Sequence, residues 1–317
     1  MSFAGESFLS VESLNQEQVS LLFSRAKTFK EEFAKKRGFD HLIRPRSASP
    51  GLVAMVFLEP STRTRISFQT AAYRLGLDSF VFDSVSSSSL IKGESLPDTL
   101  KNIAAMLPDL MVLRYGNSPD VDATLPDLGC PIINAGSGTT EHPTQALLDA
   151  FTIQEALGEL RGKKVLIVGD VVHSRVANSN LRLLTARGVE VAVCGPKSML
   201  PQEEPWDGVR KFTNLKEAAS WCDVLMGLRI QTERHGDKSE SFALAEYRDN
   251  FQVKQEHLKL MGPKGLLMHP GPVIHGVEFS PQVLQNPQCL VLTQVTNGMF
   301  VRAALMTLVM GMEVEAK

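Results

Sequence analysis

Cysteine is scarce in this 317-residue chain, and the spacing of the few present argues against zinc. The four cysteines, Cys130, Cys194, Cys222 and Cys289, stand far apart, with no Cys-x-x-Cys pair and no accompanying histidine pattern. A structural zinc site needs such ligands at short, regular spacings. Because the neighbours of these cysteines are apolar, we expect buried, reduced thiols, no bound metal and a cytoplasmic protein.

An excess of charge of one sign is also missing. Lysine and arginine together number 33, aspartate and glutamate 35, and the formal net charge is −2. This balance provides no general attraction to nucleic acid or to an anionic membrane surface. We therefore expect neither as a partner, and we expect positive charge to be concentrated in a site.

Long apolar segments are absent from the sequence as well. The most hydrophobic stretch, residues 299–312, contains Arg302 and is shorter than the ~20 residues of a membrane-spanning helix. Residues 1–10 include Glu6 and no long apolar core, so we expect no secretory signal. With 43% hydrophobic and 21% charged residues, the composition is that of a globular protein, and the length allows two domains.

Alternating strand and helix patterns in the first half of the chain predict an α/β domain. Short apolar runs bounded by turn residues predict strands at residues 52–57, 79–83, 110–114 and 131–134. Apolar side chains at helical spacing predict helices at residues 8–37, 61–75 and 97–106. We expect a mostly parallel sheet with helices on both faces.

The alternation restarts after a long helix predicted at residues 142–157. Strands are predicted at residues 163–169, 189–194, 224–228 and 265–268, and helices at residues 174–187 and 298–312. The predicted fold class is α/β, with two open, doubly wound parallel-sheet domains and the C-terminal helix packing back on the N-terminal domain. We place the first domain at residues 1–143, completed by residues 293–317, and the second at residues 144–292.

The segment Glu59–Arg65 joins a predicted strand to a predicted helix and has the character of an anion site. Ser61 and Thr62 offer hydroxyls, while Arg63 and Arg65 offer planar forks for phosphate or carboxylate. The amides and dipole at a helix start favour negative charge at the same place. The alternative is an ordinary surface helix with a Ser/Thr cap. Two hydroxyls and two arginines within five residues favour a small phosphorylated ligand.

Other polar residues open predicted helices or end predicted strands. Arg114 ends a strand at the edge where open sheets place their ligands. His142 and Gln145 lie on one face in the first turn of a helix, where they can polarise a carbonyl and hold an amide nitrogen. The alternative interpretations are a solvated arginine and a capping histidine.

The second half offers a further set of cationic and amide groups. Gly169–Arg175 resembles a dinucleotide turn but lacks the Gly-x-Gly-x-x-Gly spacing, and its Ser174 and Arg175 suit a carboxylate. Arg229 and Gln231 follow another strand and face the same way if that segment is extended. These groups bracket a dianionic molecule or are unrelated surface residues, and their spacing leaves both interpretations open.

Two stretches differ in stiffness. His269–Pro272 contains two prolines, which remove donors and aim carbonyls outward as acceptors for an amide or amine. A rigid loop without function is the alternative. Residues 84–93 are serine-rich, and by composition alone they are typical of a flexible linker.

In their order along the chain, these motifs resemble those of the aspartate and ornithine carbamoyltransferases over nearly the whole length. The matching segments are Phe57–Arg65, Ser88–Gly93, His142–Gln145, Gly169–Arg175, Arg229-x-Gln231 and His269–Pro272. Arg229-x-Gln231 with His-Pro-Gly-Pro indicates aspartate, because ornithine enzymes typically have His-Cys-Leu-Pro at the last motif. Val273 departs from relatives that often have arginine after Pro272.

The resemblance implies transfer of the carbamoyl group of carbamoyl phosphate to the amine of L-aspartate. The products are N-carbamoyl-L-aspartate and phosphate, in de novo pyrimidine biosynthesis, without a metal or cofactor. It assigns the catalytic roles to Arg63, Thr64, Lys92, Arg114, His142 and Gln145. It assigns further substrate contacts to Ser61, Thr62, Ser88, Arg175, Arg229, Gln231, Gly271 and Pro272.

The resemblance also implies an assembly. In the family, the residues matching Ser88 and Lys92 reach into the active site of a neighbouring subunit, so a homotrimer with shared active sites is expected. A regulatory chain or a dihydroorotase-like partner is left open. The alternatives to an aspartate enzyme are an ornithine carbamoyltransferase, a nucleotide-binding oxidoreductase and a catalytically silent subunit.

Overall fold

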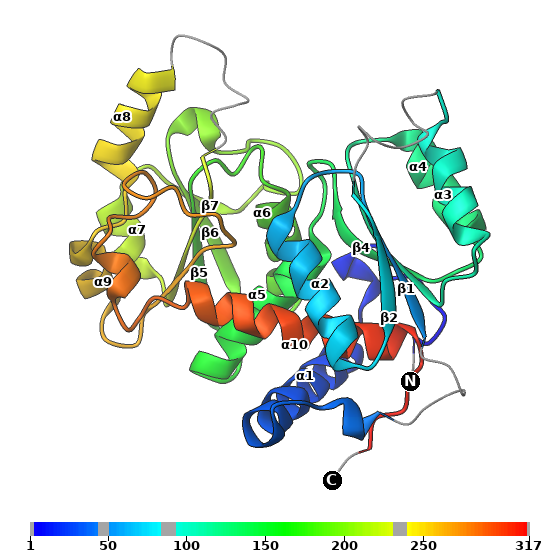
Figure 1. Ribbon diagram of the computed structural model, residues 1–317. Helices are drawn as coiled ribbons and strands as arrows, with labels where there is room; N and C mark the ends of the chain where they lie inside the picture. The colour runs from blue at the N-terminus through cyan, green and yellow to red at the C-terminus, as the bar shows by residue number, and fades with distance from the viewer. Residues whose placement is uncertain (1–2, 44–50, 84–92, 231–239, 316–317) are drawn as a thin grey trace. The chain divides into compact units, whose positions relative to one another are not determined.

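The computed structural model describes residues 3–43, 51–83, 93–230 and 240–315 (Figure 1). Its contacts divide the chain into two compact units. The first consists of Met1–Leu147 and Thr296–Lys317, and the second consists of Leu148–Val295. Each unit contains its own parallel sheet with helices on both faces, which confirms the predicted fold class.

The sheet of the first unit has four parallel strands in the order β2-β1-β3-β4. Their bounds are β1 Leu52–Phe57, β2 Asp78–Phe82, β3 Leu110–Tyr115 and β4 Ile132–Ser137. The interior strands β1 and β3 are almost entirely buried, as expected for strands covered on both faces, whereas the edge strand β2 is largely exposed. Phe57 pairs with Arg114, so the last residues of β1 and β3 lie side by side.

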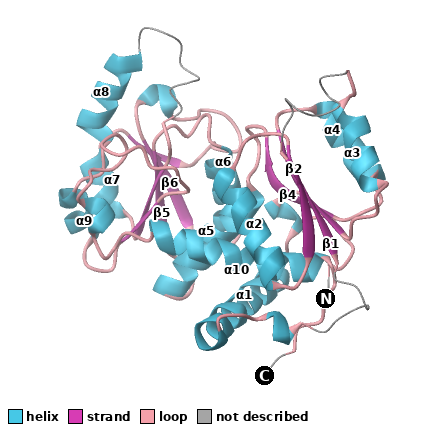
Figure 2. Ribbon diagram, in the orientation of Figure 1, coloured by secondary structure: helices cyan, strands magenta, loops and turns pink. Residues whose placement is uncertain are grey.

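Helices cover both faces of this sheet (Figure 2). On one face lie α3 (Leu96–Ala104) and α4 (Pro119–Thr124), whose apolar side chains join a cluster with β1 and β3. On the other face lies α2 (Thr62–Arg74). The C-terminal helix α10 (Val291–Val309) packs on α2 and on α1 (Gln16–Lys36), as predicted. Its contacts include Arg302 Nη1 to Ser67 Oγ at 2.8 Å and Asn297 Oδ1 to Lys30 Nζ at 2.8 Å.

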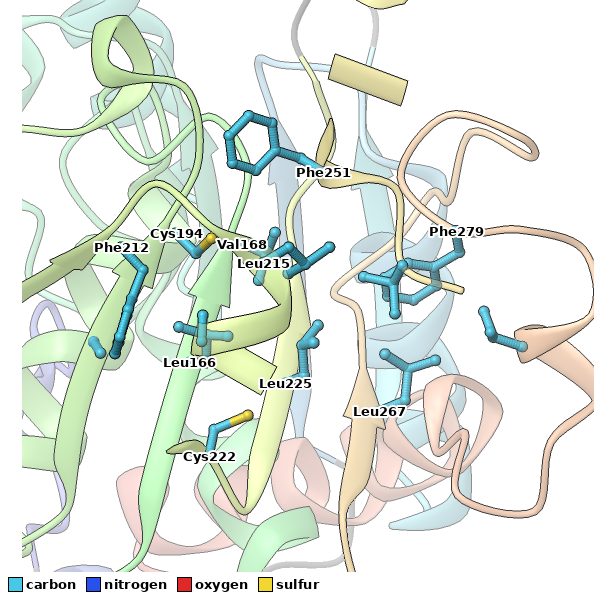
Figure 3. Close-up of a cluster of buried hydrophobic side chains, with 14 of the residues drawn as sticks. Leu166, Val168, Cys194, Phe212, Leu215, Cys222, Leu225, Phe251, Leu267 and Phe279 are labelled. Carbon is cyan, nitrogen blue, oxygen red and sulfur yellow. The ribbon is translucent and has the colours of Figure 1, made fainter. Parts of the chain in front are cut away.

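The sheet of the second unit has five parallel strands in the order β7-β6-β5-β8-β9. Their bounds are β5 Lys164–Val168, β6 Glu190–Cys194, β7 Arg210–Phe212, β8 Val224–Gly227 and β9 Leu266–Met268. The remaining helices are α5 Pro143–Leu157, α6 Arg175–Thr185, α7 Leu215–Trp221, α8 Glu240–Phe251 and α9 Gln255–Met261. One face of the sheet carries the main core of the unit, in which Leu166, Leu225 and Leu267 come from neighbouring strands (Figure 3).

Several predicted boundaries were wrong. The helix predicted at residues 8–37 begins at Gln16, because Phe8 pairs with Ile133 and a capping box formed by Asn15 and Gln18 starts the helix. The helix predicted at residues 298–312 begins earlier, at Val291. The prediction missed α4, β7, α7, α8 and α9, most of which are too short for a clear periodic pattern. Among the described residues, no helix has both the length and the apolar character needed to cross a membrane.

Candidate active site

Three neighbouring strand ends bring the predicted anion-binding residues of the first unit to one edge. Because β1, β3 and β4 are parallel and adjacent, their carboxyl ends share that edge. β1 leads into Ser61–Thr64, Arg114 lies at the end of β3, and the chain after β4 leads to His142. The Leu58 N–H donates to the Arg114 carbonyl at 2.8 Å, which fixes the first two segments against each other.

The start of α2 differs from other serine-capped helices in the protein. Ser10, Ser95, Ser118 and Ser174 each accept a bond from an amide in the first turn of the helix they precede. Within the described part of the chain, the Ser61 hydroxyl makes no such capping bond, although its carbonyl accepts from Arg65 N at 3.1 Å. A helix start whose own cap does not use its hydroxyl is suited to an external anion.

His142 and Gln145 occupy the first turn of α5, as predicted. The His142 carbonyl accepts from Gln145 N at 3.0 Å, and Pro143 is the first helical residue. The His142 ring lies with Nε2 3.5 Å from Thr64 Oγ1, and all three side chains are at most 7% exposed. The ring, the hydroxyl and the amide therefore offer polar groups in a largely dry place, where a carbonyl dipole is strongly stabilised.

The guanidinium of Arg114 is buried and held in place. Its Nη1 donates to the Ala135 carbonyl at 3.2 Å, and its Nη2 lies 3.7 Å from Glu59 Oε2. Glu59 therefore lies beside a candidate site residue, although the sequence analysis gave it no role. Its place inside the Phe57–Arg65 motif was the only available signal, because the pairing with Arg114 depends on the strand register.

The two arginines at the start of α2 have different surroundings. Arg65 forms an ion pair with Asp83, directly after β2. Its positive charge is therefore paired with Asp83, which argues against the prediction that Arg65 binds a phosphate or carboxylate ligand. Arg63 is exposed at the helix start and keeps its place among the candidate residues.

Three neighbouring strand ends in the second unit make a comparable edge. Arg175 opens α6 after β5, Arg229 follows β8, and Gly271 with Pro272 follows β9. The order β5-β8-β9 places these segments side by side. The Ser174 hydroxyl accepts from Ala177 N at 3.1 Å and so caps α6, which leaves Arg175 as the carboxylate-binding candidate of this motif.

Gly169 makes the turn after β5 feasible. Its φ of +131° is strained for any residue with a side chain, and a Cβ there would lie 3.2 Å from Leu228. The next residue, Asp170, is fully buried and binds His173 Nδ1 at 2.9 Å. These contacts shape the loop that leads to Arg175.

A buried polar chain fixes the His269–Pro272 turn. His269 Nδ1 accepts from Gly271 N at 2.8 Å, and the His269 N–H donates to Gln294 Oε1 at 2.8 Å. Gln294 in turn donates to Asp149 Oδ1 at 2.8 Å, and Asn180 donates to Asp149 Oδ2 at 2.9 Å. All of these side chains are nearly inaccessible to solvent. The turn is thus tied through these bonds to α10, α5 and α6.

The predicted residues are gathered within each unit. The first unit brings together Ser61, Thr62, Arg63, Thr64, Arg114, His142 and Gln145 at one sheet edge. The second brings together Arg175, Arg229, Gly271 and Pro272 at another. Three further residues, Ser88, Lys92 and Gln231, lie outside the described residues.

The cysteines stand apart from these groups. Burial raises the pKa of Cys194 and Cys222 to about 12, so their thiols stay protonated at neutral pH. Cys130 and Cys289 are partly buried, and burial raises their pKa too. Within residues 3–43, 51–83, 93–230 and 240–315, we find no group of three or more histidine, cysteine or acidic side chains arranged to hold a metal ion.

Two family models match the chain in sequence. The model described as "Aspartate/ornithine carbamoyltransferase, carbamoyl-P binding domain" matches residues 6–155, and "Aspartate/ornithine carbamoyltransferase, Asp/Orn binding domain" matches residues 161–309. The aspartate carbamoyltransferase catalytic subunit of Desulfitobacterium hafniense is 42% identical, over 98% of this chain and 97% of that protein. The catalytic subunit of the same name from Christiangramia forsetii is 43% identical, over 95% and 94%.

The solved structures similar to this chain include aspartate transcarbamoylases. Aspartate transcarbamoylase from Trypanosoma cruzi in complex with N-(phosphonacetyl)-L-aspartic acid has a TM-score of 0.85 at 28% identity, covering 97% of this chain and 96% of that chain. The catalytic subunit of M. jannaschii aspartate transcarbamoylase has a TM-score of 0.83 at 32% identity, covering 95% and 96%.

Proposed function

Because the chain belongs to the aspartate/ornithine carbamoyltransferase family, we propose that it transfers the carbamoyl group of carbamoyl phosphate to L-aspartate. The products are N-carbamoyl-L-aspartate and phosphate, and the reaction serves de novo pyrimidine biosynthesis. The observation that carries the proposal is the first-unit edge, where Thr64 and His142 meet 3.5 Å apart beside the start of α2. That arrangement offers a helix start for a phosphate and donors for a carbonyl.

Carbamoyl phosphate is assigned to the first unit. Its phosphate lies against the start of α2 with Ser61, Thr62 and Arg63, where the helix dipole and the guanidinium favour negative charge. Its carbonyl oxygen faces Thr64, Arg114 and His142. The carbamoyl NH2 donates to the side-chain carbonyl of Gln145.

L-Aspartate is assigned to the second unit. Arg175 and Arg229 each present a guanidinium after a strand end, and a guanidinium fork matches a carboxylate in bidentate geometry. The Arg229-x-Gln231 motif adds Gln231 to the residues that we propose bind aspartate. Two cations suit a dicarboxylate acceptor better than an acceptor with a cationic side chain, which is the physical reason to prefer aspartate over ornithine.

The chemical step needs little more than positioning and charge stabilisation. The lone pair of the aspartate amine attacks the carbamoyl carbon, a tetrahedral oxyanion forms, and the bond from that carbon to the phosphate oxygen breaks. Arg114, Thr64 and His142 stabilise the oxyanion, and Arg63 stabilises the departing phosphate. The phosphate takes the proton that the amine loses, so His142 acts as a donor to oxygen rather than as the general base.

Product analysis with both acceptors tests the proposal. Purified chain, carbamoyl phosphate and L-aspartate should yield N-carbamoyl-L-aspartate and phosphate in equal amounts without added metal. L-Ornithine in place of aspartate is the control and should yield no citrulline above background. Turnover of ornithine with none of aspartate would establish the second candidate function instead.

We further propose a cytoplasmic homotrimer in which Ser88 and Lys92 complete the site of a neighbouring chain. The support is the match of residues 88–93 to the family's motif and the likeness to catalytic subunits over nearly the whole chain. The native mass of the purified protein tests this assembly. Purification from the source organism would reveal whether a regulatory chain or a dihydroorotase accompanies it.

A further inference from the structure

A buried carboxylate links two loops of the second unit that the sequence gives no reason to connect. Glu278 is 1% exposed, and each of its oxygens accepts one backbone N–H. Oε1 accepts from Ile230 N at 3.0 Å, and Oε2 accepts from Ile274 N at 2.7 Å. Ile230 directly follows Arg229, and Ile274 lies two residues after Pro272. One side chain therefore spans the loop after β8 and the turn after β9.

The burial of the segment after β8 explains why this link matters to Arg229. Leu228 and Ile230 are each 2% exposed, whereas Arg229 between them is exposed. This alternation is typical of an extended segment whose neighbouring side chains point to opposite sides. Because both neighbours are buried and the Ile230 amide is held by Glu278, the backbone at Arg229 has little freedom.

The next residue holds the same two loops by packing. The Phe279 ring lies edge-on to His269, with centroids 5.3 Å apart, within the core cluster of the second unit (Figure 3). A Cβ added at Gly227, the last residue of β8, would come within 2.5 Å of that ring. The pair Glu278–Phe279 thus contacts the end of β8 and the end of β9 at once.

The pKa of Glu278 lies above its ordinary value, because burial outweighs the groups that favour the charged form. Backbone amides, including those of Ile230 and Ile274, and the positive charge of Arg229 oppose the rise. Hydrogen bonds from backbone amides to an ionised carboxylate are stronger than those between neutral groups. An uncharged amide in the same place has one oxygen for two donors, so one buried N–H loses its acceptor.

We propose that Glu278 is a positioning residue for acceptor specificity, which holds Arg229 at a fixed spacing from the Pro272 turn. The inference rests on the proposed function, because it assigns Arg229 to the aspartate carboxylate. Glu278 itself touches no substrate and acts through the segment that carries Arg229.

The Glu278→Gln variant tests the proposal through a selective kinetic loss. We expect kcat/KM for aspartate to fall about 10- to 100-fold, mainly through KM, because one buried amide is left unpaired and the Arg229 segment shifts. Half-saturation by carbamoyl phosphate should change by less than about two-fold. If the variant weakens the use of carbamoyl phosphate as much as that of aspartate, the proposal is overturned.

A double-variant cycle shows whether the effect passes through Arg229. In an Arg229→Ala background, adding Glu278→Gln should lower kcat/KM for aspartate by less than about two-fold further. If the double variant instead loses kcat/KM for aspartate by the product of the two single-variant losses, the proposal is overturned. The matched control is Asp223→Asn, which removes a carboxylate that accepts Lys164 N at 2.8 Å at the opposite end of the same sheet. It should leave the selectivity unchanged.

Amide hydrogen exchange separates this inference from the proposed function. In Glu278→Gln the amides of Ile230 and Ile274 should exchange faster, while those of the β5 core keep their protection. Unchanged exchange at both amides would overturn the inference even if the enzyme is active. If the unmodified chain does not carbamoylate aspartate, the proposed function fails. The exchange measurement still shows whether Glu278 holds the amides of Ile230 and Ile274. Should the glutamine variant not fold, Glu278→Asp carries the same three measurements.

Discussion

The Thr64 hydroxyl lies 3.5 Å from Nε2 of His142, although 78 positions separate the two residues in the chain. Thr64 belongs to the helix that follows β1, and His142 precedes the helix that follows β4. The parallel order of the sheet makes this meeting possible, since all of its strands end at one edge. We propose that the carbonyl oxygen of the substrate binds beside this pair.

We predict that His142→Ala lowers kcat by about 100- to 1,000-fold, the loss typical of removing one donor to a developing oxyanion. KM for both substrates should change much less, because the interaction strengthens mainly in the transition state. Steady-state kinetics with each substrate varied in turn measure the effect. An equal rise in KM with unchanged kcat would place His142 in ground-state binding instead.

Replacing Arg229 tests the acceptor side. Arg229→Ala should mainly weaken aspartate use, at a cost of roughly 2–5 kcal/mol if the charge pair is desolvated. Carbamoyl phosphate binding, measured by calorimetry without aspartate, should be unaffected. Arg210→Ala is a suitable control, because that arginine is also exposed and begins β7, outside the candidate residues. Aspartate kinetics equal to those of the unmodified chain would remove Arg229 from the site.

Much of this arrangement could be predicted from the sequence, because strand ends in a parallel sheet share an edge. The motif at residues 57–65, Arg114 and His142 each follow or end a strand with a clear apolar pattern, so their meeting follows from topology alone. Arg65 could not be separated from Arg63 in the same way. Its partner Asp83 stands after a different strand, and only the pairing of β1 with β2 brings the two charges together.

The supporting residues could not be predicted, because their partners are far along the chain. Glu278 binds an amide 48 positions away, and Gln294 binds Asp149 at a separation of 145 positions. Neither carboxylate stands in a motif with a known chemical role. A buried acidic side chain is visible in a sequence only as a polar residue among apolar ones, which does not identify the group it binds.

The buried chain under the His269–Pro272 turn should contribute to stability as well as to the site. Asp149→Ala removes the acceptor of both Gln294 and Asn180, and leaving a buried donor without a partner costs about 1–3 kcal/mol each. We expect urea unfolding to show a loss of about 3–5 kcal/mol. Asp127→Ala, at an exposed position, is the control and should stay within about 0.5 kcal/mol. A small loss for Asp149→Ala would mean that the network is not needed for the fold.

The buried thiols predict a fall in stability at alkaline pH. Burial raises the pKa of Cys194 and Cys222 from 9.0 to about 12, so ionisation favours the unfolded chain. Their contribution should be constant below pH 9 and should be lost progressively as the pH rises toward 12. Denaturation midpoints from pH 7 to 11 measure this, with a Cys194→Ala, Cys222→Ala double variant as reference. Parallel curves for the two proteins would contradict the assignment.

The proposed sharing of sites predicts complementation between two inactive variants. Lys92→Ala removes the cation that each chain gives to its neighbour, and Arg63→Ala removes one that each chain keeps for its own phosphate site. Both homotrimers should be nearly inactive. In a cyclic trimer that contains both variants, one site takes Arg63 from one chain and Lys92 from the next, so that site is complete.

The two variants are mixed one to one, dissociated and reassociated. About three quarters of the random trimers then contain both variants, and each of these has about one intact site in three. The mixture should therefore regain about one quarter of the normal activity. A mixture that is never dissociated is the control and should remain inactive. Mass spectrometry of differently tagged chains verifies that mixed trimers form. If they form and the activity does not return, Lys92 acts within its own chain and the sites are not shared.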